Sequence, residues 1–116
     1  MVEITVRDFL AENLPTPVFM EFPVDPVTRF VILRKTDSGR ENRLDSAMFV
    51  ADSYGESLLE AAKLNELVKA AMDDLTDLDV VSASEPAGDY PAFDEKNKRY
   101  RYQAVFNITY YEEGVK

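Results

Sequence analysis

One alternating segment governs how this chain folds: Lys98-Arg99-Tyr100-Arg101-Tyr102-Gln103-Ala104-Val105-Phe106-Asn107-Ile108-Thr109-Tyr110-Tyr111. Strict alternation of this kind is typical of a half-buried strand. One face is apolar or aromatic throughout and carries Tyr100, Tyr102, Ala104, Phe106, Ile108 and Tyr110. The other face carries Arg101, Gln103, Val105, Asn107, Thr109 and Tyr111. Because the run is longer than the usual strand of about five or six residues, we expect a central strand or one that reaches beyond its own sheet.

Shorter patterns predict the other elements. A short helix is expected over 5–13, with Thr5 as its cap. Strands are expected over 18–22, 30–36, 46–54 and 80–84, with a polar loop at 37–43 and a longer loop at 85–97. This order predicts one domain over residues 1–116, of the α+β class. We expect a single mixed or antiparallel sheet of about four to five strands, covered by one long and one short helix.

The long helix is predicted from Ser57 to about Leu75. Gly55 ends the strand before it, Ser57 stands at the N-cap position, and Glu60 follows three residues later. This spacing is that of a capping box, in which each side chain satisfies a free backbone N–H group. Apolar residues then recur with helical spacing, at Leu58, Ala61, Leu64, Val68, Ala71, Met72 and Leu75.

Composition argues against several functions. The net charge of −9 argues against binding to nucleic acid, since that affinity depends on neutralising phosphates, and against binding to an anionic membrane surface. The chain has neither histidine nor cysteine, so it lacks the commonest general base and metal ligand and any thiolate nucleophile. No apolar run approaches the roughly 20 residues that span a bilayer, and we expect neither a transmembrane helix nor a signal peptide.

Two carboxylate clusters are the remaining candidates for chemistry. Asp73, Asp74, Asp77 and Asp79 form the first, and Asp89, Asp94 and Glu95 form the second. A hard cation such as Ca²⁺ prefers oxygen ligands, but neither cluster has EF-hand spacing. The first also follows the C-terminal end of a helix, where acidic residues oppose the helix dipole. We therefore predict no catalytic residue, no cofactor site and no metal site.

Contacts with a partner or another subunit are predicted in the two polar loops and at the start of the last strand. The candidates are Arg40, Glu41, Arg43, Tyr90, Phe93, Arg99 and Arg101. Arginine and aromatic side chains are the usual anchors of protein interfaces, and a loop as long as 85–97 is often functional or mobile. The competing interpretation is that the charges are solvated, or that Arg99 and Arg101 act as gatekeepers before an aromatic strand.

Several segments together carry a resemblance to a known family. They are the loop Asp37-Ser38-Gly39-Arg40-Glu41-Asn42, the strand end Asp52-Ser53-Tyr54-Gly55, the helix Ser57-Leu58-Leu59-Glu60-Ala61-Ala62-Lys63-Leu64-Asn65-Glu66 and the strand Lys98-Arg99-Tyr100-Arg101-Tyr102-Gln103-Ala104-Val105-Phe106. In this order they resemble the small tail-completion proteins of tailed phages and prophages of Gram-positive bacteria. The resemblance covers nearly the whole chain and implies a single tail-terminator-like domain over residues 1–116.

The resemblance implies a non-enzymatic structural protein of the virion. Tail terminators have an α+β fold and cap the finished tail tube as a homomeric ring, commonly a hexamer, which also provides the surface for head–tail joining. The implied partners are further copies of the chain, the major tail tube protein and a head-completion protein. DNA passes through the ring without specific binding, and no membrane is involved. The implied location is the host cytoplasm during assembly and then the head–tail junction of the virion.

Other functions remain open at this point. A head-completion or connector protein of the phage neck is the nearest alternative. A soluble acidic binding or inhibitor module belongs to a different class and is compatible with the charge of −9, although the even scatter of lysine and arginine argues against a concentrated mimic of nucleic acid. A carboxylate-dependent enzyme ranks last.

Overall fold

The computed structural model describes residues 1–41 and 44–111. Its elements are α1 (Val2–Asn13), β1 (Val18–Phe19), β2 (Phe30–Glu41), β3 (Leu44–Gly55), α2 (Leu58–Asp73), the short 3₁₀ helix η1 (Asp74–Asp77), β4 (Val81–Pro91) and β5 (Tyr100–Tyr110). The five strands form one sheet in the order β1-β2-β3-β5-β4. Strand β1 runs parallel to β2 and the other pairs are antiparallel, so the sheet is mixed. The predicted α+β class, with one long and one short helix, is confirmed.

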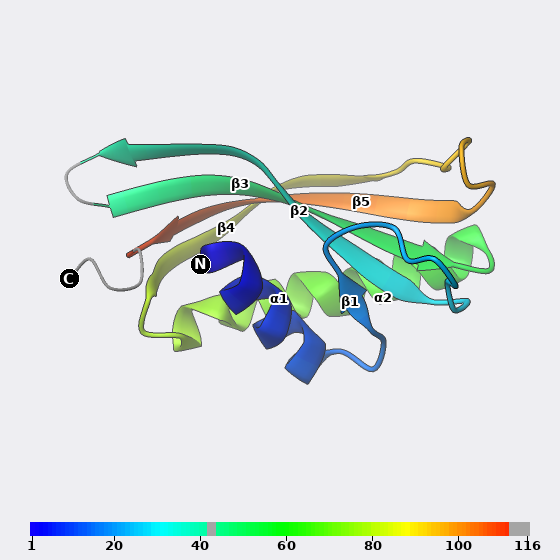
Figure 1. Cartoon of the computed structure of the whole chain (residues 1–116), viewed down its shortest axis with the longest axis horizontal. Helices are drawn as coiled ribbons and strands as arrows, with labels where there is room; N and C mark the ends of the chain where they lie inside the picture. Colours follow the sequence, from blue (N-terminus) through cyan, green and yellow to red (C-terminus); the bar gives the residue numbers. More distant parts are fainter. Residues whose placement is uncertain (42–43, 112–116) are drawn as a thin grey trace.

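Both helices lie against the same face of the sheet (Figure 1). Helix α2 packs across β3 and β5, and α1 lies beside it against β1 and β2. We call the opposite side of the sheet the open face, because no helix covers it. The molecule measures 43 × 23 × 23 Å, and its long axis follows the strands. Its two ends are therefore well separated surfaces.

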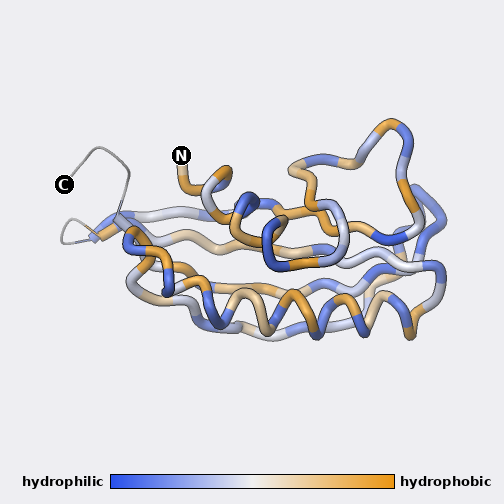
Figure 2. The backbone as a smooth tube through the Cα atoms, turned by 90° about the horizontal axis from the view of Figure 1, so that it is seen from below, coloured by the Kyte–Doolittle hydropathy of each residue, from blue (hydrophilic) through white to orange (hydrophobic). Residues whose placement is uncertain are grey.

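The main core lies between the helices and the sheet. Helix α2 alternates hydrophobic and hydrophilic residues along its length (Figure 2), and its apolar stripe meets the inner side chains of the strands. The largest fully buried members of this core are Leu10, Met72, Leu75, Phe49, Phe106 and Ile108. Successive strand residues point to opposite faces, which explains why the buried residues of β5 are Ala104, Phe106, Ile108 and Tyr110.

A second, smaller cluster lies on the open face at one end of the sheet. Phe30 and Tyr54 stack with their ring centroids 4.6 Å apart, and Phe22 meets both rings edge-on. Ile32 completes the buried set. Because Phe22 belongs to the segment that joins β1 to β2, that segment covers this end of the open face and leaves the rest of the face uncovered.

Ser57 is the N-cap residue of helix α2, as predicted. The Glu60 backbone N–H donates to the Ser57 hydroxyl oxygen at 3.2 Å. The prediction for α1 was wrong at its start, because Met1 rather than Thr5 is the N-cap residue. Thr5 instead donates its hydroxyl to the Met1 carbonyl, one turn back along the helix. The expected strand over 18–22 is also shorter than predicted and ends at Phe19.

Both predicted loops are largely strand. Strand β2 continues through most of the predicted 37–43 loop, and β4 continues to Pro91 within the predicted 85–97 loop. Polar residues extend these strands because pairing uses the backbone and not the side chain. The prolines of β4 are tolerated since this strand lies at the sheet edge. The pairing register between β4 and β5 shifts between Pro86 and Asp89, where a bulge forms and Gly88 has a φ of 122°.

Candidate interaction surfaces

The turn between β4 and β5 forms a projecting tip at one end of the molecule (Figure 1). Two backbone hydrogen bonds close it: the Asp94 N–H donates to the Arg99 carbonyl at 2.9 Å, and the Arg99 N–H donates to the Asp94 carbonyl at 3.2 Å. Lys98 adopts a φ of 57°, in the left-handed region that non-glycine residues rarely occupy. We call residues 92–99 the tip; its conformation has to be held in place by its surroundings.

Asp94 supplies most of that restraint. Its carboxylate, only 5% exposed, accepts hydrogen bonds from the Tyr54 hydroxyl at 2.8 Å, the Asn97 N–H at 3.1 Å and the Asn97 side-chain amide at 2.9 Å. Arg101 lies 3.9 Å away. Burial raises the pKa of Asp94, but the hydrogen bonds from Asn97 and Tyr54 outweigh it and hold that pKa below its usual value. Burial and the bond to Asp94 raise the pKa of Tyr54 to about 12.

The two predicted contact arginines near the tip are engaged within the chain. The Arg101 Nε donates to the Ala92 carbonyl at 2.8 Å and so ties β5 to the start of the tip. The Arg99 Nη1 donates to the Val27 carbonyl at 3.3 Å, and its guanidinium lies 5.8 Å from the centre of the Phe30 ring. Both side chains therefore fix the tip to the body of the protein.

Two exposed aromatic rings project beside the tip. Phe93 and Tyr100 meet edge to face with centroids 5.3 Å apart, and they are 42% and 44% exposed. Tyr100 lies on the apolar face of the alternating run but is exposed, because it pairs across the sheet with Gly55, which has no side chain to cover it. Tyr90 is 50% exposed but pairs with Gln103 on the open face, so it is not part of this aromatic pair.

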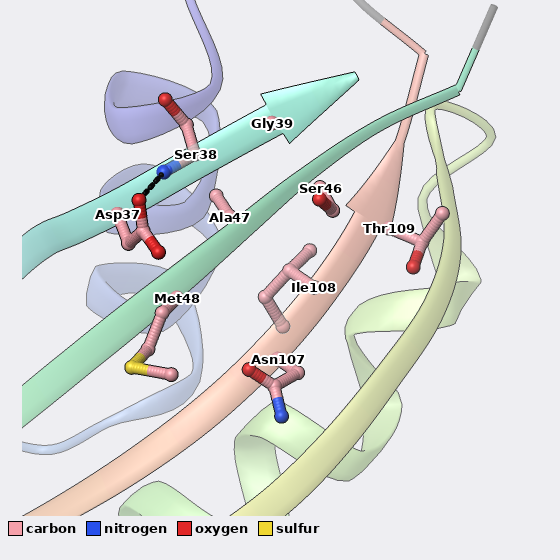
Figure 3. Close-up of a pocket in the computed structure, with 9 residues that line it drawn as sticks. All are labelled: Asp37, Ser38, Gly39, Ser46, Ala47, Met48, Asn107, Ile108 and Thr109. Atoms are coloured by element: carbon pink, nitrogen blue, oxygen red, sulfur yellow. Dashed lines mark hydrogen bonds between the residues drawn. The ribbon is translucent and has the colours of Figure 1, made fainter. Parts of the chain in front are cut away.

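The far end of the open face is hollowed between β2, β3 and β5 (Figure 3). The hollow has a volume of about 340 Å³ and is lined by Asp37, Ser38, Gly39, Ser46, Ala47, Met48, Asn107, Ile108 and Thr109. Asp37 accepts a hydrogen bond from the Ser38 N–H at 2.9 Å. Since the hollow is shallow and open and its lining is both polar and apolar, it suits a contact with another protein surface better than a buried small molecule.

The remaining predicted contacts belong to this hairpin end. Arg40 is exposed and lies 3.7 Å from Asp45, and Glu41 is exposed beside it. Arg43 lies outside the described residues. The structure thus does not bring the predicted contact residues into one site. It divides them between the tip at one end of the molecule and the β2–β3 hairpin at the other.

Sequence reasoning missed a polar network in the middle of the open face. Asp52, 3% exposed, accepts hydrogen bonds from the Arg34 Nε at 3.1 Å and from the Gln103 side-chain amide at 2.7 Å. These residues come from β2, β3 and β5, so the network ties three strands together. The available signal was Asp52 directly after the apolar run Ala47-Met48-Phe49-Val50-Ala51, together with Gln103 in the last strand.

A second unpredicted network lies between α2 and β4. Asp89 accepts hydrogen bonds from the Lys69 ammonium at 3.0 Å and from the Asn65 side-chain amide at 2.8 Å. The bond from Lys69 holds the pKa of Asp89 below its usual value, and the same bond raises the pKa of Lys69. This contact fixes the bulged part of β4 to the helix, on the side of the sheet away from the open face.

The described part of the chain holds no group of three or more acidic side chains arranged to bind a metal ion. Across residues 1–41 and 44–111, no helix has the length and apolar character needed to cross a membrane. Comparison with protein-family models gives no match to this chain, and comparison with curated proteins gives none either. The surfaces described above are therefore the basis for assigning a function.

Proposed function

We propose that this chain is a tail-completion protein of a tailed phage or prophage, and specifically a tail terminator. In this proposal it is a non-enzymatic structural protein that forms a homomeric ring, a hexamer by the family resemblance, on the end of the finished tail tube. One face of the ring matches the tube, and the other accepts the head-completion protein and no further tube subunit. DNA passes through the ring without specific binding.

The observation that carries the proposal is the tip. A strained turn is held rigid by a buried carboxylate and two arginines, and it presents two exposed aromatic rings. Rigid aromatic side chains bind a partner at little entropic cost, and such anchors dominate the energy of protein interfaces. A surface of this kind supports a role in assembly.

The arrangement of the rest of the molecule agrees with a ring subunit. Its helices cover one face of the sheet only, and the uncovered face carries an open hollow at the hairpin end. The two ends differ in chemistry, and in the proposed ring unlike surfaces of neighbouring copies meet. Contacts between unlike surfaces generate closed rings when the rotation between copies closes.

Light scattering across a range of protein concentrations, with negative-stain imaging of the same fractions, tests the proposal. Rings with a central hole are expected, either from the free protein or after purified tail tubes are added. A strict monomer that also ignores tail tubes would contradict the proposal and favour an acidic binding module. Binding to the head-completion side without binding to tubes would favour a neck connector.

Substitution of the aromatic anchor tests the role of the tip in the same assay. Phe93→Ala is expected to weaken ring formation or tube binding while leaving the fold intact, since this ring is exposed. Leu67→Ala is the matched control, because Leu67 is also an exposed apolar residue but lies on α2, away from the tip. Equal assembly by both variants would remove the tip from the interface.

A further inference from the structure

The tip carries three basic residues, Lys96, Lys98 and Arg99, against two acidic ones, Asp94 and Glu95, on a chain whose net charge is −9. Lys96 is exposed and has no partner among the described residues, and Lys98 is exposed with only a long contact of 3.9 Å to Glu95. Lys98 lines the same surface depression as Tyr100, and Lys96 lies three residues after Phe93 in the tip. The tip is therefore an aromatic surface flanked by cations on a strongly acidic protein.

The opposite end of the molecule carries the complementary charge. Segment 73–79 comprises the last residue of α2, η1 and the turn into β4, and Figure 1 shows it at the end away from the tip. Its four aspartates, Asp73, Asp74, Asp77 and Asp79, are all exposed. None of them has a basic partner among the described residues. They also follow a helix C-terminus, where the backbone carbonyls add negative potential.

We propose that the tip of one copy docks against segment 73–79 of the next copy. This inference rests on the proposed ring and identifies the two surfaces that meet in it. Opposite charges at unlike ends guide the two surfaces together and oppose contact between like ends. The exposed rings of Phe93 and Tyr100 lose water in the contact and provide the apolar part of its stability.

The rigidity of the tip fits this role. Asp94, Arg99 and Arg101 hold the turn in one conformation through contacts within the chain. A contact that fixes the angle between neighbouring copies must not flex if the ring is to close at a defined number of subunits. A surface built only to attract a flexible partner would not need these restraints.

A charge-swap experiment tests the proposal. The tip variant carries Lys96→Glu and Lys98→Glu, and the segment variant carries Asp74→Lys and Asp77→Lys. All four positions are exposed, so circular dichroism should show an unchanged fold. Each variant alone places like charges in the contact and is expected to weaken assembly by more than about tenfold. The exposed Glu12→Lys on α1 is the control for a charge change elsewhere, and its assembly should match wild type.

Mixing the two variants gives the decisive result. In the mixture each reversed tip meets a reversed segment, and each native tip meets a native segment. An even-numbered ring of alternating variants is therefore expected to form where neither variant assembles alone. Suppose that the wild type forms rings. If each variant alone then assembles as well as the wild type, or if mixing the variants does not restore ring formation, the proposed pairing of the tip with segment 73–79 is wrong, but the proposed ring is not contradicted. If the wild type forms no ring with or without tubes, the proposed function and this inference fail together.

Discussion

Asp94 should be the residue on which the tip depends most. Replacing it with alanine removes three hydrogen bonds to a charged acceptor, and the Tyr54 hydroxyl, in a side chain that is almost fully buried, loses the carboxylate to which it donates. Hydrogen bonds to charged groups are worth about 1.5–3 kcal/mol each, and an unpaired buried polar group costs about 1–3 kcal/mol. Because these contributions are not additive, we expect Asp94→Ala to lower the free energy of unfolding by about 3 kcal/mol.

Urea denaturation of the purified protein measures this loss. Asp94→Asn keeps the shape and one carbonyl acceptor, so its loss should be smaller than that of alanine. Glu95→Ala is the matched control next in the chain, where the side chain is 83% exposed, and it should change stability by less than about 0.5 kcal/mol. An Asp94→Ala protein within about 0.5 kcal/mol of wild type would refute the reasoning that Asp94 holds the tip.

The dependence on pH provides a second test of the same residue. Because the folded protein lowers the pKa of Asp94, the carboxylate stabilises the fold fully above its unfolded pKa of about 4. That contribution is lost as the pH falls through the lower, folded pKa. The difference in stability between wild type and Asp94→Asn should therefore be constant near neutral pH and shrink under acid. A difference that grows as the pH falls would contradict the assigned direction.

Three further substitutions test the fold. Gly55→Ala should destabilise the protein by about 1–3 kcal/mol in thermal melts, because a Cβ there would lie 2.7 Å from the Ala61 backbone nitrogen. Gly39→Ala is the control and should be tolerated, since its Cβ would meet nothing closer than 3.6 Å. Ser57→Ala should cost about 1 kcal/mol in chemical denaturation through loss of the cap, and an unchanged midpoint would show that the cap is dispensable. Phe106→Ala should cost about 3–5 kcal/mol by leaving a cavity in the core, and retention of wild-type stability would mean that this core collapses around the gap.

Local patterns predicted the parts of the fold that depend on neighbours in sequence. The alternation along β5 and the Ser57 cap of α2 are set by side chains a few residues apart. The extents of β2 and β4 could not be predicted, because polar side chains and prolines hide strands whose pairing is made by the backbone. Turn-forming residues such as Asp37 and Gly39 indicated a loop where the structure has a strand.

The candidate surfaces were less accessible to prediction than the fold. Phe93 was identified from its place in a polar loop, and it is exposed as expected. Its neighbour Tyr100 was missed because its exposure depends on the register that places Gly55 opposite it. The contacts of Asp94 and of Asp52 join residues from three or more segments, so no pattern within one segment could reveal them.

The most direct test of the account is whether the protein stops a growing tail tube. The purified chain is added while tail tube protein from the phage or prophage that, by the proposed function, encodes it polymerises, and tube length and tube ends are examined by cryo-electron microscopy. If the chain is a tail terminator, tubes stop lengthening and one end of each carries a ring built from this chain. Tubes that grow to the same length with bare ends, while the chain stays free in solution, would contradict it.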